Sequence, residues 1–289
     1  MQGMAVYFKS VFDKKSSMDS ELQEVFQSNS TSYYYSSLFF PQEVKEDVFK
    51  LYAYVRKADD FVDEEPQNAE ALKHFRRKTF ENWESGRTDD KIVNSFLEVA
   101  REKDFRKEWV EAFLDSMEKD LHKSNYVTME ETLEYIHGSA EVIGLMMAAI
   151  LELDENSYRY AEMLGRSMQY CNFIRDVKED NELGREYLPD EQLEKHGLSS
   201  LKKDEIDEKA FEEFMREQIK IYREWQGEAE KGLKYIPYRS RIPVILSSRL
   251  YKWTAKKIEK KPMKVYDEKV RPSKIRIGWE LLKSLRGEV

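Results

Sequence analysis

The chain has a single cysteine, Cys171, so no disulfide can form within it. This favours a reducing, cytosolic setting, in which Cys171 packs as a small buried apolar side chain. The four histidines are scattered and show no spacing typical of zinc sites. The N-terminus lacks an apolar secretory segment, and the longest mostly apolar stretch, 142–151, is well short of the ~20 residues that span a bilayer. We therefore expect a soluble, cytoplasmic protein with at most peripheral membrane contact.

Proline and glycine are scarce as well. Seven prolines occur, none of them between Pro66 and Pro189, and there are 11 glycines. Long proline-free stretches with apolar residues every three to four positions are typical of helices. No convincing alternation of period two and no Asn-Gly or Asp-Gly hairpin turn is present. Since no clear linker or internal repeat divides the chain, the sequence predicts one all-α bundle over residues 1–289.

Positive charge is not in excess. The chain has 56 acidic and 48 basic residues, which gives a formal net charge of −8. A general nucleic-acid-binding protein usually carries a basic face, so the composition disfavours that class and predicts no nucleic-acid partner. Hydrophobic residues make up 40% of the chain and aromatic residues 13%, so a substantial core is available.

The apolar periodicity divides the chain into helical segments whose ends carry recognisable signals. Pro41 suits the first turn of a helix, and Thr128 begins a capping-box pattern, TMEE. Gly138 and Gly144 are expected to interrupt or kink the apolar segment that follows, up to Leu153. We expect a loop or turn over 29–40, an irregular stretch or short helix over 189–200, and helices over 20–28, 41–65, 69–84, 91–103, 106–123, 128–135, 156–180, 204–236, 243–260 and 273–286.

The most informative stretch is 170–189, YCNFIRDVKEDNELGREYLP. It places Asn172, Asp176 and Asp180 at strict four-residue spacing, so in a helix their side chains form one line on one face. Core-like residues one and two turns earlier extend the same line. Mg²⁺ prefers carboxylate oxygens, keeps several waters and bridges to substrate phosphates. The line therefore predicts one half of a magnesium site.

A second stretch, 56–63 (RKADDFVD), repeats the four-residue spacing with Asp59 and Asp63. Together with Tyr52 and Arg56, these aspartates lie on the apolar side of the expected helix, whereas surface charges normally lie opposite the apolar stripe. Burying such groups costs several kcal/mol unless they are paired or bind a metal. Taken alone, the stretch also fits a solvated helix end. With the stretch 170–189 beside it, two facing acidic helices are favoured as the active site of a Mg²⁺-dependent enzyme.

Several neighbouring residues have two interpretations. Arg56, Arg175 and Arg185 can pair with the carboxylates or bind phosphate oxygens in a bidentate manner. The tyrosines of 33–35, like Tyr52 and Tyr187, offer hydroxyls to phosphate and rings to an apolar wall, or pack in the core. The first interpretation of the segment 143–151 (IGLMMAAIL) is that it packs in the core. The alternative is that it forms the wall of a tunnel for an apolar substrate.

These stretches resemble the signatures of the squalene/phytoene synthase family, the head-to-head prenyl synthases. The segments STSYYYSSLFFP and LYAYVRKADDFVD together resemble the family's first signature, and NFIRDVKEDNELGREYLP resembles its second. The segment YIHGSAEVIG resembles a glycine-containing segment of the family but has Glu141 where a small residue is usual. The segment 235–258 is similar to the family's C-terminal helices. The resemblance extends from about residue 26 to 286.

The resemblance implies an isoprenoid synthase fold, a single helical bundle around a central cavity. It implies that Mg²⁺ is bound at one prenyl diphosphate by Asp59 and Asp63, and from the other side by Asn172, Asp176 and Asp180. It implies catalytic roles for these four aspartates and for Tyr52, whose ring is a candidate to stabilise carbocations. The residues implied to bind diphosphate oxygens are Ser30, Ser32, Tyr52, Arg56, Asn172, Arg175, Tyr251 and Lys269.

The reaction implied by the resemblance has two stages. One allylic diphosphate ionises, a second prenyl diphosphate captures the cation to give a cyclopropylcarbinyl diphosphate, and a second ionisation rearranges this to the 1–1′ linked product. The GREYLP form and the lack of a C-terminal anchor look more like the phytoene branch, which uses two geranylgeranyl diphosphates. The alternative is synthesis of squalene or dehydrosqualene from two farnesyl diphosphates, and squalene formation would also require NADPH.

Two further classes are weighed against these. A catalytically silent helical assembly factor of the same fold would typically lose an aspartate from one acidic motif, and here all four are present. A head-to-tail prenyl synthase or terpene cyclase shares the metal chemistry, but RDVKED followed by GREYLP argues against it. The oligomeric state and any partner that accepts the product stay open.

Overall fold

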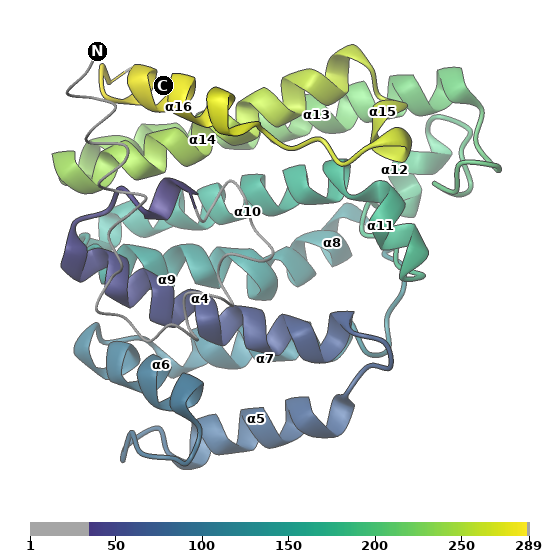
Figure 1. The fold of residues 1–289 in the computed structure, drawn as a ribbon. Coiled ribbons are helices and arrows are strands. Elements are labelled where there is room, and N and C mark those ends of the chain that lie inside the picture. The colour runs from purple at the N-terminus through teal and green to yellow at the C-terminus, as the bar shows by residue number, and fades with distance from the viewer. Residues whose placement is uncertain (1–34, 288–289) are drawn as a thin grey trace.

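The computed structural model describes residues 35–287, and the regular elements among them are helices, with only an isolated bridge between Asn125 and Glu186 besides (Figure 1). This confirms the all-α prediction. The α-helices are α4 (Gln42–Asp63), α5 (Ala69–Glu81), α6 (Lys91–Glu102), α7 (Lys107–Lys119), α8 (Met129–Ile136), α9 (Val142–Ile150), α10 (Tyr158–Arg175), α11 (Val177–Glu182), α12 (Asp190–Glu194), α13 (Glu208–Glu230), α14 (Tyr238–Lys260), α15 (Lys264–Asp267) and α16 (Lys274–Ser284). Three short helices of other types join them: η1 (His137–Glu141), η2 (Glu155–Ser157) and η3 (Lys231–Tyr235).

Local sequence signals explain where several helices begin. Pro41 occupies the N-cap position of α4, as expected for a residue without an N–H. The Thr128 hydroxyl accepts a hydrogen bond from the backbone N–H of Glu131 at the start of α8. The Glu131 carboxylate in turn accepts one from the N–H of Val127 rather than of Thr128. The capping box predicted at TMEE is therefore present, with its return bond moved by one residue.

Some predicted boundaries were wrong. The helix expected from Pro243 begins at Tyr238, because Pro237 takes the N-cap position and Pro243 lies inside the second turn of α14. Pro243 removes one intrahelical hydrogen bond, since the N–H of the sixth helical residue would otherwise bond to the carbonyl of Arg239. The four-residue helix α15 was not predicted, and the helix expected over 20–28 lies outside the described residues. The loop or turn expected over 29–40 was wrong in part, because residues 35–37 are helical and only the residues after them form a turn.

Close packing of backbones explains the interruption predicted near Gly138 and Gly144. Between α8 and α9 the chain forms a π-helical turn, η1. A Cβ added to Gly144 would lie 2.2 Å from the carbonyl oxygen of Ala161 on α10. A Cβ added to Gly165 on α10 would lie 2.3 Å from the carbonyl oxygen of Ala140 on η1. Gly144 and Gly165 thus let the η1–α9 segment approach α10 more closely than side chains would permit.

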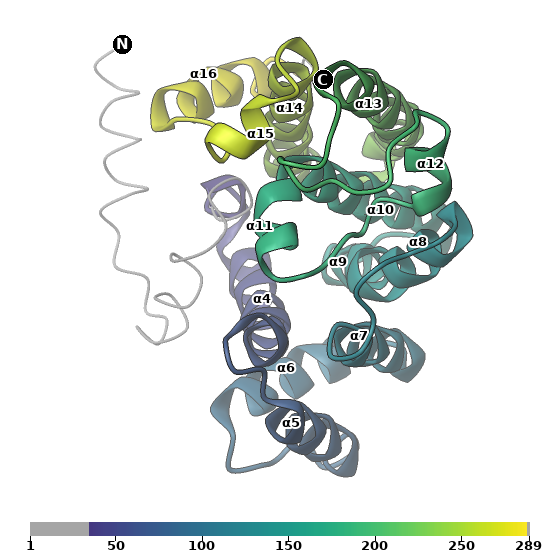
Figure 2. The same cartoon turned by 90° about the vertical axis from the view of Figure 1, so that its right-hand side faces the viewer.

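Two main groups of buried side chains make up the core. One joins α4, α5, α6, α7 and α9, and the other joins α8, α10, α13 and part of α14. Viewed nearly along the helix axes, α4, α9, α10 and α14 surround a central region, with α11 at its near end (Figure 2). Cys171 is buried in the second group, as predicted, and burial raises the pKa of its thiol to about 12.

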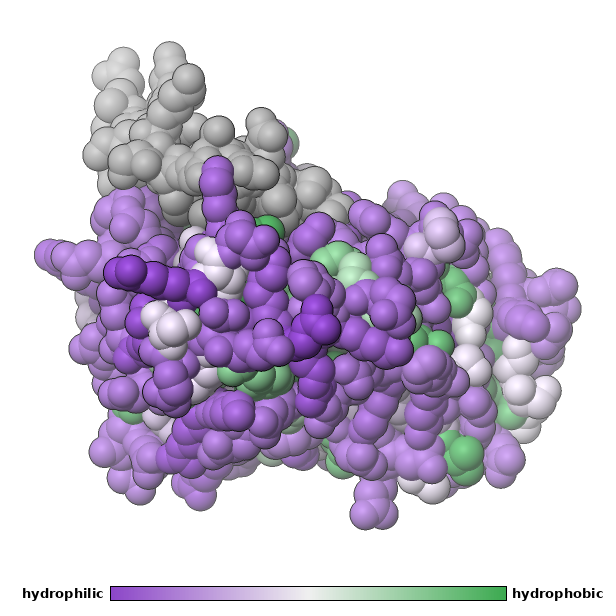
Figure 3. Space-filling model, turned by 90° about the horizontal axis from the view of Figure 1, so that it is seen from below, coloured by the Kyte–Doolittle hydropathy of each residue, from purple (hydrophilic) through white to green (hydrophobic). Residues whose placement is uncertain are grey.

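One face of the molecule carries few apolar side chains among the described residues. Seen from below, it is mostly hydrophilic, with hydrophobic residues separated from one another (Figure 3). Across residues 35–287, no helix has both the length and the apolar character that crossing a membrane requires.

Candidate active site

A cavity of about 540 Å³ lies between α4, α9, α10 and α14. The C-terminal ends of α4 and α10 both point to the side of the molecule where α11 lies (Figure 1). The cavity is polar at this end and apolar at the other. Its polar end is lined by Tyr52, Arg56, Asp59, Asp63, Asp120, Tyr135, Asn172, Arg175, Asp176, Glu179, Asp180, Arg185, Tyr187, Tyr251, Lys269 and Arg271.

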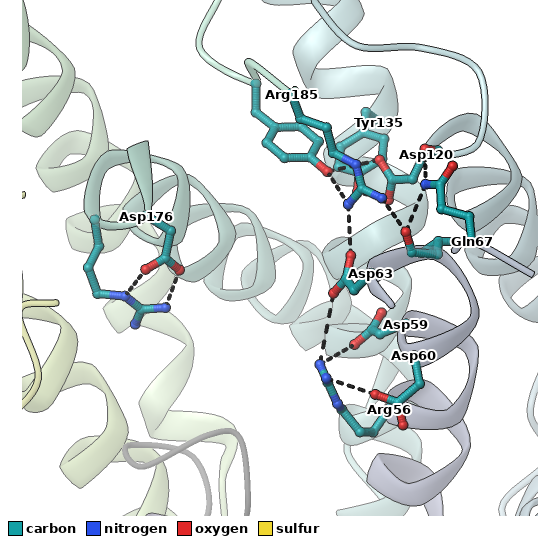
Figure 4. A network of polar contacts seen from close by, with 12 residues as sticks. Arg56, Asp59, Asp60, Asp63, Gln67, Asp120, Tyr135, Asp176 and Arg185 are labelled. Carbon is teal, nitrogen blue, oxygen red and sulfur yellow. Dashed lines mark hydrogen bonds and ion pairs between the residues drawn. The ribbon is translucent and has the colours of Figure 1, made fainter. Parts of the chain in front are cut away.

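Helix α4 presents its predicted site residues on one face toward the cavity. Tyr52, Arg56, Asp59 and Asp63 follow one another by three or four positions, and all four line the cavity. The Arg56 guanidinium is 2.7 Å from Asp60 and 3.9 Å from Asp59 (Figure 4). The acidic stretch 56–63 is therefore not simply a solvated helix end.

Asp59 differs from its neighbours in its electrostatic surroundings. Although 31% of its side chain is exposed, the cavity walls surround much of the rest. This burial, together with the negative charge of Asp63, raises the pKa of Asp59 well above its usual value despite the nearby Arg56. The carboxyl group is thus poorly compensated by the protein's own positive charges.

The sequence predicted one continuous helix through Asn172, Asp176 and Asp180, but the structure breaks it at Asp176. Helix α10 ends at Arg175, Asp176 has non-helical dihedral angles, and α11 begins at Val177. The backbone N–H of Asp176 still bonds to the carbonyl of Asn172, and that of Asp180 to the carbonyl of Asp176, each at 2.8 Å. Because these bonds retain the helical spacing, all three side chains line the cavity.

Asp176 is held by two cations. The Arg175 guanidinium donates to both of its carboxylate oxygens, at 2.8 and 2.5 Å, and the Lys269 ammonium lies 3.1 Å away. Burial opposes ionisation of Asp176, but Arg175 and Lys269 outweigh it and lower the pKa of this carboxyl. The predicted phosphate ligands Arg175 and Lys269 are therefore engaged with a carboxylate at the cavity wall.

Asp180 has no such compensation. Burial, and next the negative charge of Asp176, raise its pKa well above the usual value, although Lys269 acts in the opposite direction. Nearby, the Asn172 side-chain oxygen and one Glu179 carboxylate oxygen are buried without a hydrogen-bond partner among the described residues. Buried polar atoms are normally satisfied. Unpartnered oxygens beside uncompensated carboxylates are a donor set that suits Mg²⁺.

A polar network supports the α4 side of the cavity (Figure 4). The sequence named Arg185, as a possible partner of the carboxylates, and Tyr187, but it did not point to Asp120 or Tyr135. Arg185 donates to Asp63 at 2.7 Å and to the carbonyl of Val62 at 2.6 Å. Buried Asp120 accepts hydrogen bonds from the hydroxyls of Tyr135 at 2.6 Å and Tyr187 at 2.9 Å. Burial raises the pKa of Asp120 to about 6. The network fixes the end of α4 against the chain after α11.

The two predicted tyrosine ligands both line the cavity. Burial raises the pKa of Tyr52 to about 12 and also raises that of Tyr251, so both phenols stay protonated and can donate hydrogen bonds. Ser30 and Ser32 lie outside the described residues. So do two of the three tyrosines of 33–35.

The apolar segment 143–151 contributes to both the core and the cavity. Met146 is buried in the core, whereas Ile143, Met147, Ala148 and Leu151 line the cavity. Both interpretations of this segment thus hold for different residues of it.

Glu141, the departure in the glycine-containing segment, does not line the cavity, although Ser139, Ala140 and Gly144 do. Its buried carboxylate bonds instead to Arg166 and, at 3.0 Å, to His137. Burial opposes its ionisation, but these two partners lower its pKa.

Comparisons with known proteins agree with this architecture. A family model described as squalene/phytoene synthase matches residues 26–276. A chloroplastic phytoene synthase from an Oncidium hybrid cultivar is 30% identical over 253 residues, which cover 79% of this chain and 58% of that protein. A 15-cis-phytoene synthase from Pantoea ananas is 26% identical, over 83% of this chain and 82% of that protein. The chain thus spans less than two thirds of the plant relative's length.

The fold also matches a solved structure. The crystal structure of a dehydrosqualene synthase in complex with a ligand has a TM-score of 0.82 at 22% sequence identity, and the match covers 93% of this chain and 98% of that one. The likeness confirms the predicted isoprenoid synthase fold.

Proposed function

The chain belongs to the squalene/phytoene synthase family, and we propose that it condenses two geranylgeranyl diphosphates head to head to give phytoene. The condensation is the 1–1′ joining that passes through a cyclopropylcarbinyl diphosphate. The choice of geranylgeranyl diphosphate is supported by relatives named phytoene synthase at up to 30% identity.

One observation carries this proposal: two acidic motifs from separate parts of the chain line the same end of a cavity that is apolar at its other end. A prenyl diphosphate has the matching division, with a head that carries several negative charges and a long apolar chain. Asp59 and Asp63 come from α4, whereas Asn172, Asp176 and Asp180 come from α10 and α11. Because all four aspartates line the cavity, this arrangement favours an enzyme over a catalytically silent member of the fold.

The acidic end is suited to Mg²⁺. We propose that Asp59 and Asp63 hold it on one side and Asn172, Asp176 and Asp180 on the other. The bound cation supplies positive charge that stabilises the departing diphosphate. Without it, the uncompensated carboxylates and the diphosphate would repel one another.

The chain's own residues bind and orient the diphosphates. Tyr52 and Tyr251 remain protonated near neutral pH because burial raises their pKa values, so they donate hydrogen bonds to phosphate oxygens. The charges of Arg56, Arg175 and Lys269 lie at the cavity wall and offset part of the diphosphate charge. Ser30 and Ser32 are proposed to add further hydrogen bonds.

The apolar part of the cavity orders the prenyl chains and excludes water. Its wall includes Val55, Ile143, Met147 and Leu164. Holding both reacting carbons in one site makes a bimolecular step effectively unimolecular. Apolar walls that exclude water protect a carbocation from being captured by it. The face of the Tyr52 ring is available to stabilise passing positive charge.

The proposal is tested by analysing the products of the purified protein. It is incubated with Mg²⁺ and either farnesyl or geranylgeranyl diphosphate, each with and without NADPH, and the hydrocarbons are identified by mass spectrometry. A C40 hydrocarbon formed without NADPH supports phytoene synthesis. A C30 product moves the assignment to squalene or dehydrosqualene, which NADPH dependence separates. No product from either substrate overturns the enzymatic proposal.

The acidic motifs are tested by Asp59→Ala and Asp176→Ala, made separately. Each should lower turnover at least about 100-fold, the size of effect expected when a major electrostatic contribution is removed. The control is Glu64→Ala, an exposed acidic residue that directly follows α4 and does not line this cavity. Its turnover should match the parent protein, and circular dichroism should show that all three variants are folded. Near-normal activity in either aspartate variant contradicts the two-helix site.

A further inference from the structure

The side chain of Tyr160 lines the cavity at the end of α10 that is opposite the acidic motifs. This residue lies in the first turn of α10, is only 6% exposed and lines the cavity. Around it, the end of the cavity is formed by Leu151, Leu153, Ser157, Ala161, Gly232, Leu233 and Ile236. Tyr160 is the largest side chain of this group.

Helix α10 runs along the cavity, so positions on it give the distance from the acidic end. Residues of α10 line the cavity at every turn, among them Tyr160, Leu164, Met168 and Asn172, and Asp176 follows directly after the helix. At a rise of 1.5 Å per residue, the backbone positions of the first and last are about 24 Å apart. A chain whose diphosphate is bound at the acidic end therefore extends along α10 toward the Tyr160 ring.

The Tyr160 ring is held in place from several sides. Behind it the ring of Tyr235 stacks with centroids 5.8 Å apart, and Tyr235 is 36% exposed. The Arg159 guanidinium lies 4.4 Å from the ring centroid and bonds to the hydroxyl. Gly232 allows the η3 backbone to press against the ring, since a Cβ there would lie 2.3 Å from the Tyr160 Cβ. The ring thus cannot swing aside without displacing backbone.

We propose that Tyr160 sets the length of prenyl chain that the cavity accepts. The ring lies between the apolar cavity and the partly exposed Tyr235 and blocks the prenyl chain there, so removing the ring extends the cavity toward the surface. A longer chain would then fit without folding back on itself. This inference rests on the proposed function, because it takes a prenyl diphosphate as the ligand.

The test uses Tyr160→Ala and a series of farnesyl, geranylgeranyl and geranylfarnesyl diphosphates. For each pair of neighbouring lengths, kcat/KM of the longer substrate is divided by that of the shorter. At the pair where the parent protein discriminates against the longer chain, Tyr160→Ala should raise this ratio about tenfold or more, the effect of burying about two further methylene groups. Tyr160→Leu, which retains an apolar side chain, should shift the ratio in the same direction if the alanine variant does not fold.

Two matched variants separate the possible causes. Tyr160→Phe keeps the ring and loses only the bond to Arg159, so its length preference should equal that of the parent protein. Ala161→Leu adds volume at the same end of the cavity, so its ratio should fall. An unchanged ratio in Tyr160→Ala and Tyr160→Leu, or an equal shift in Tyr160→Phe, overturns the proposal.

A binding measurement distinguishes this failure from failure of the proposed function. Unreactive thiodiphosphate analogues of the same lengths are titrated calorimetrically into each folded variant. If the parent protein binds none of them and converts no substrate, the proposed function fails. If it binds and converts them while the Tyr160 variants keep the parent's length preference, only the role of Tyr160 fails.

Discussion

Asp120 gives the sharpest test of the polar network at the cavity, through the variant Asp120→Asn. The carboxyl is buried, accepts bonds from Tyr135 and Tyr187, and lies near Arg185. Burial raises its pKa from 3.8 to about 6 even though these three neighbours act to lower it. Asparagine retains the shape and an accepting oxygen but cannot titrate. Comparing the two proteins therefore isolates the proton at this one position.

The sign and size of the effect follow from linkage. A carboxyl whose pKa is higher in the folded state binds its proton more tightly there, so its stabilising contribution is complete below pH 3.8 and is lost as the pH rises through about 6. The whole shift corresponds to about 3 kcal/mol at 1.36 kcal/mol per pKa unit. Between pH 7.5 and pH 5, the part gained is about 1.4 kcal/mol.

The assay is urea unfolding of both proteins at several pH values in this range, with a chelator present to remove divalent cations. The free energy of unfolding of the parent protein minus that of Asp120→Asn should rise by about 1.4 kcal/mol from pH 7.5 to 5. Asp204→Asn, which makes the same substitution at an exposed aspartate, is measured beside it as the control. A constant difference for Asp120→Asn, or one that falls as the pH is lowered, would refute the reasoning.

Three further predictions concern packing, capping and metal binding. Gly165→Ala should lower the free energy of unfolding by about 1–3 kcal/mol, because its Cβ would lie 2.3 Å from a backbone carbonyl. In Gly278→Ala, where the Cβ meets nothing, urea unfolding should show no loss. Thr128→Ala should cost about 1 kcal/mol by the same measurement, and Thr128→Ser should recover most of it. Calorimetry with Mg²⁺ alone should show weaker binding as the pH falls, because protons compete at Asp59 and Asp180, whose pKa values are raised. An affinity that does not change with pH would contradict this.

The parts of the site that sequence could predict are those set within a single helix. The spacing of Asp59 and Asp63, and of Asn172, Asp176 and Asp180, follows from the helical period. That period places each set on one face regardless of the rest of the fold. Even the break at Asp176 did not alter this outcome, because backbone bonds spanning four residues continue on both sides of it.

The residues that sequence missed depend on contacts between distant parts of the chain. Asp120 follows α7 in a run of charged residues and has no local feature that distinguishes it from a solvated side chain. Its burial results from Tyr135, 15 residues away, and Tyr187, 67 residues away. The role proposed for Tyr160 likewise depends on η3, which reaches α10 only after α13 has crossed the bundle.

The charges at the acidic end follow one pattern on both sides of the cavity. On α4, Asp63 is bonded to Arg185, while Asp59 has a raised pKa. On α10 and α11, Asp176 is bonded to Arg175 and Lys269, while Asp180 has a raised pKa. Each side thus has one aspartate neutralised by the protein and one that favours a proton in the absence of another cation. If only the paired Asp63 and Asp176 were needed to orient the helix ends, Asp59 and Asp180 would lower the stability of the fold with nothing to offset it. Their presence is explained if a divalent cation replaces the proton at both positions, which would join the two helices through the diphosphate between them.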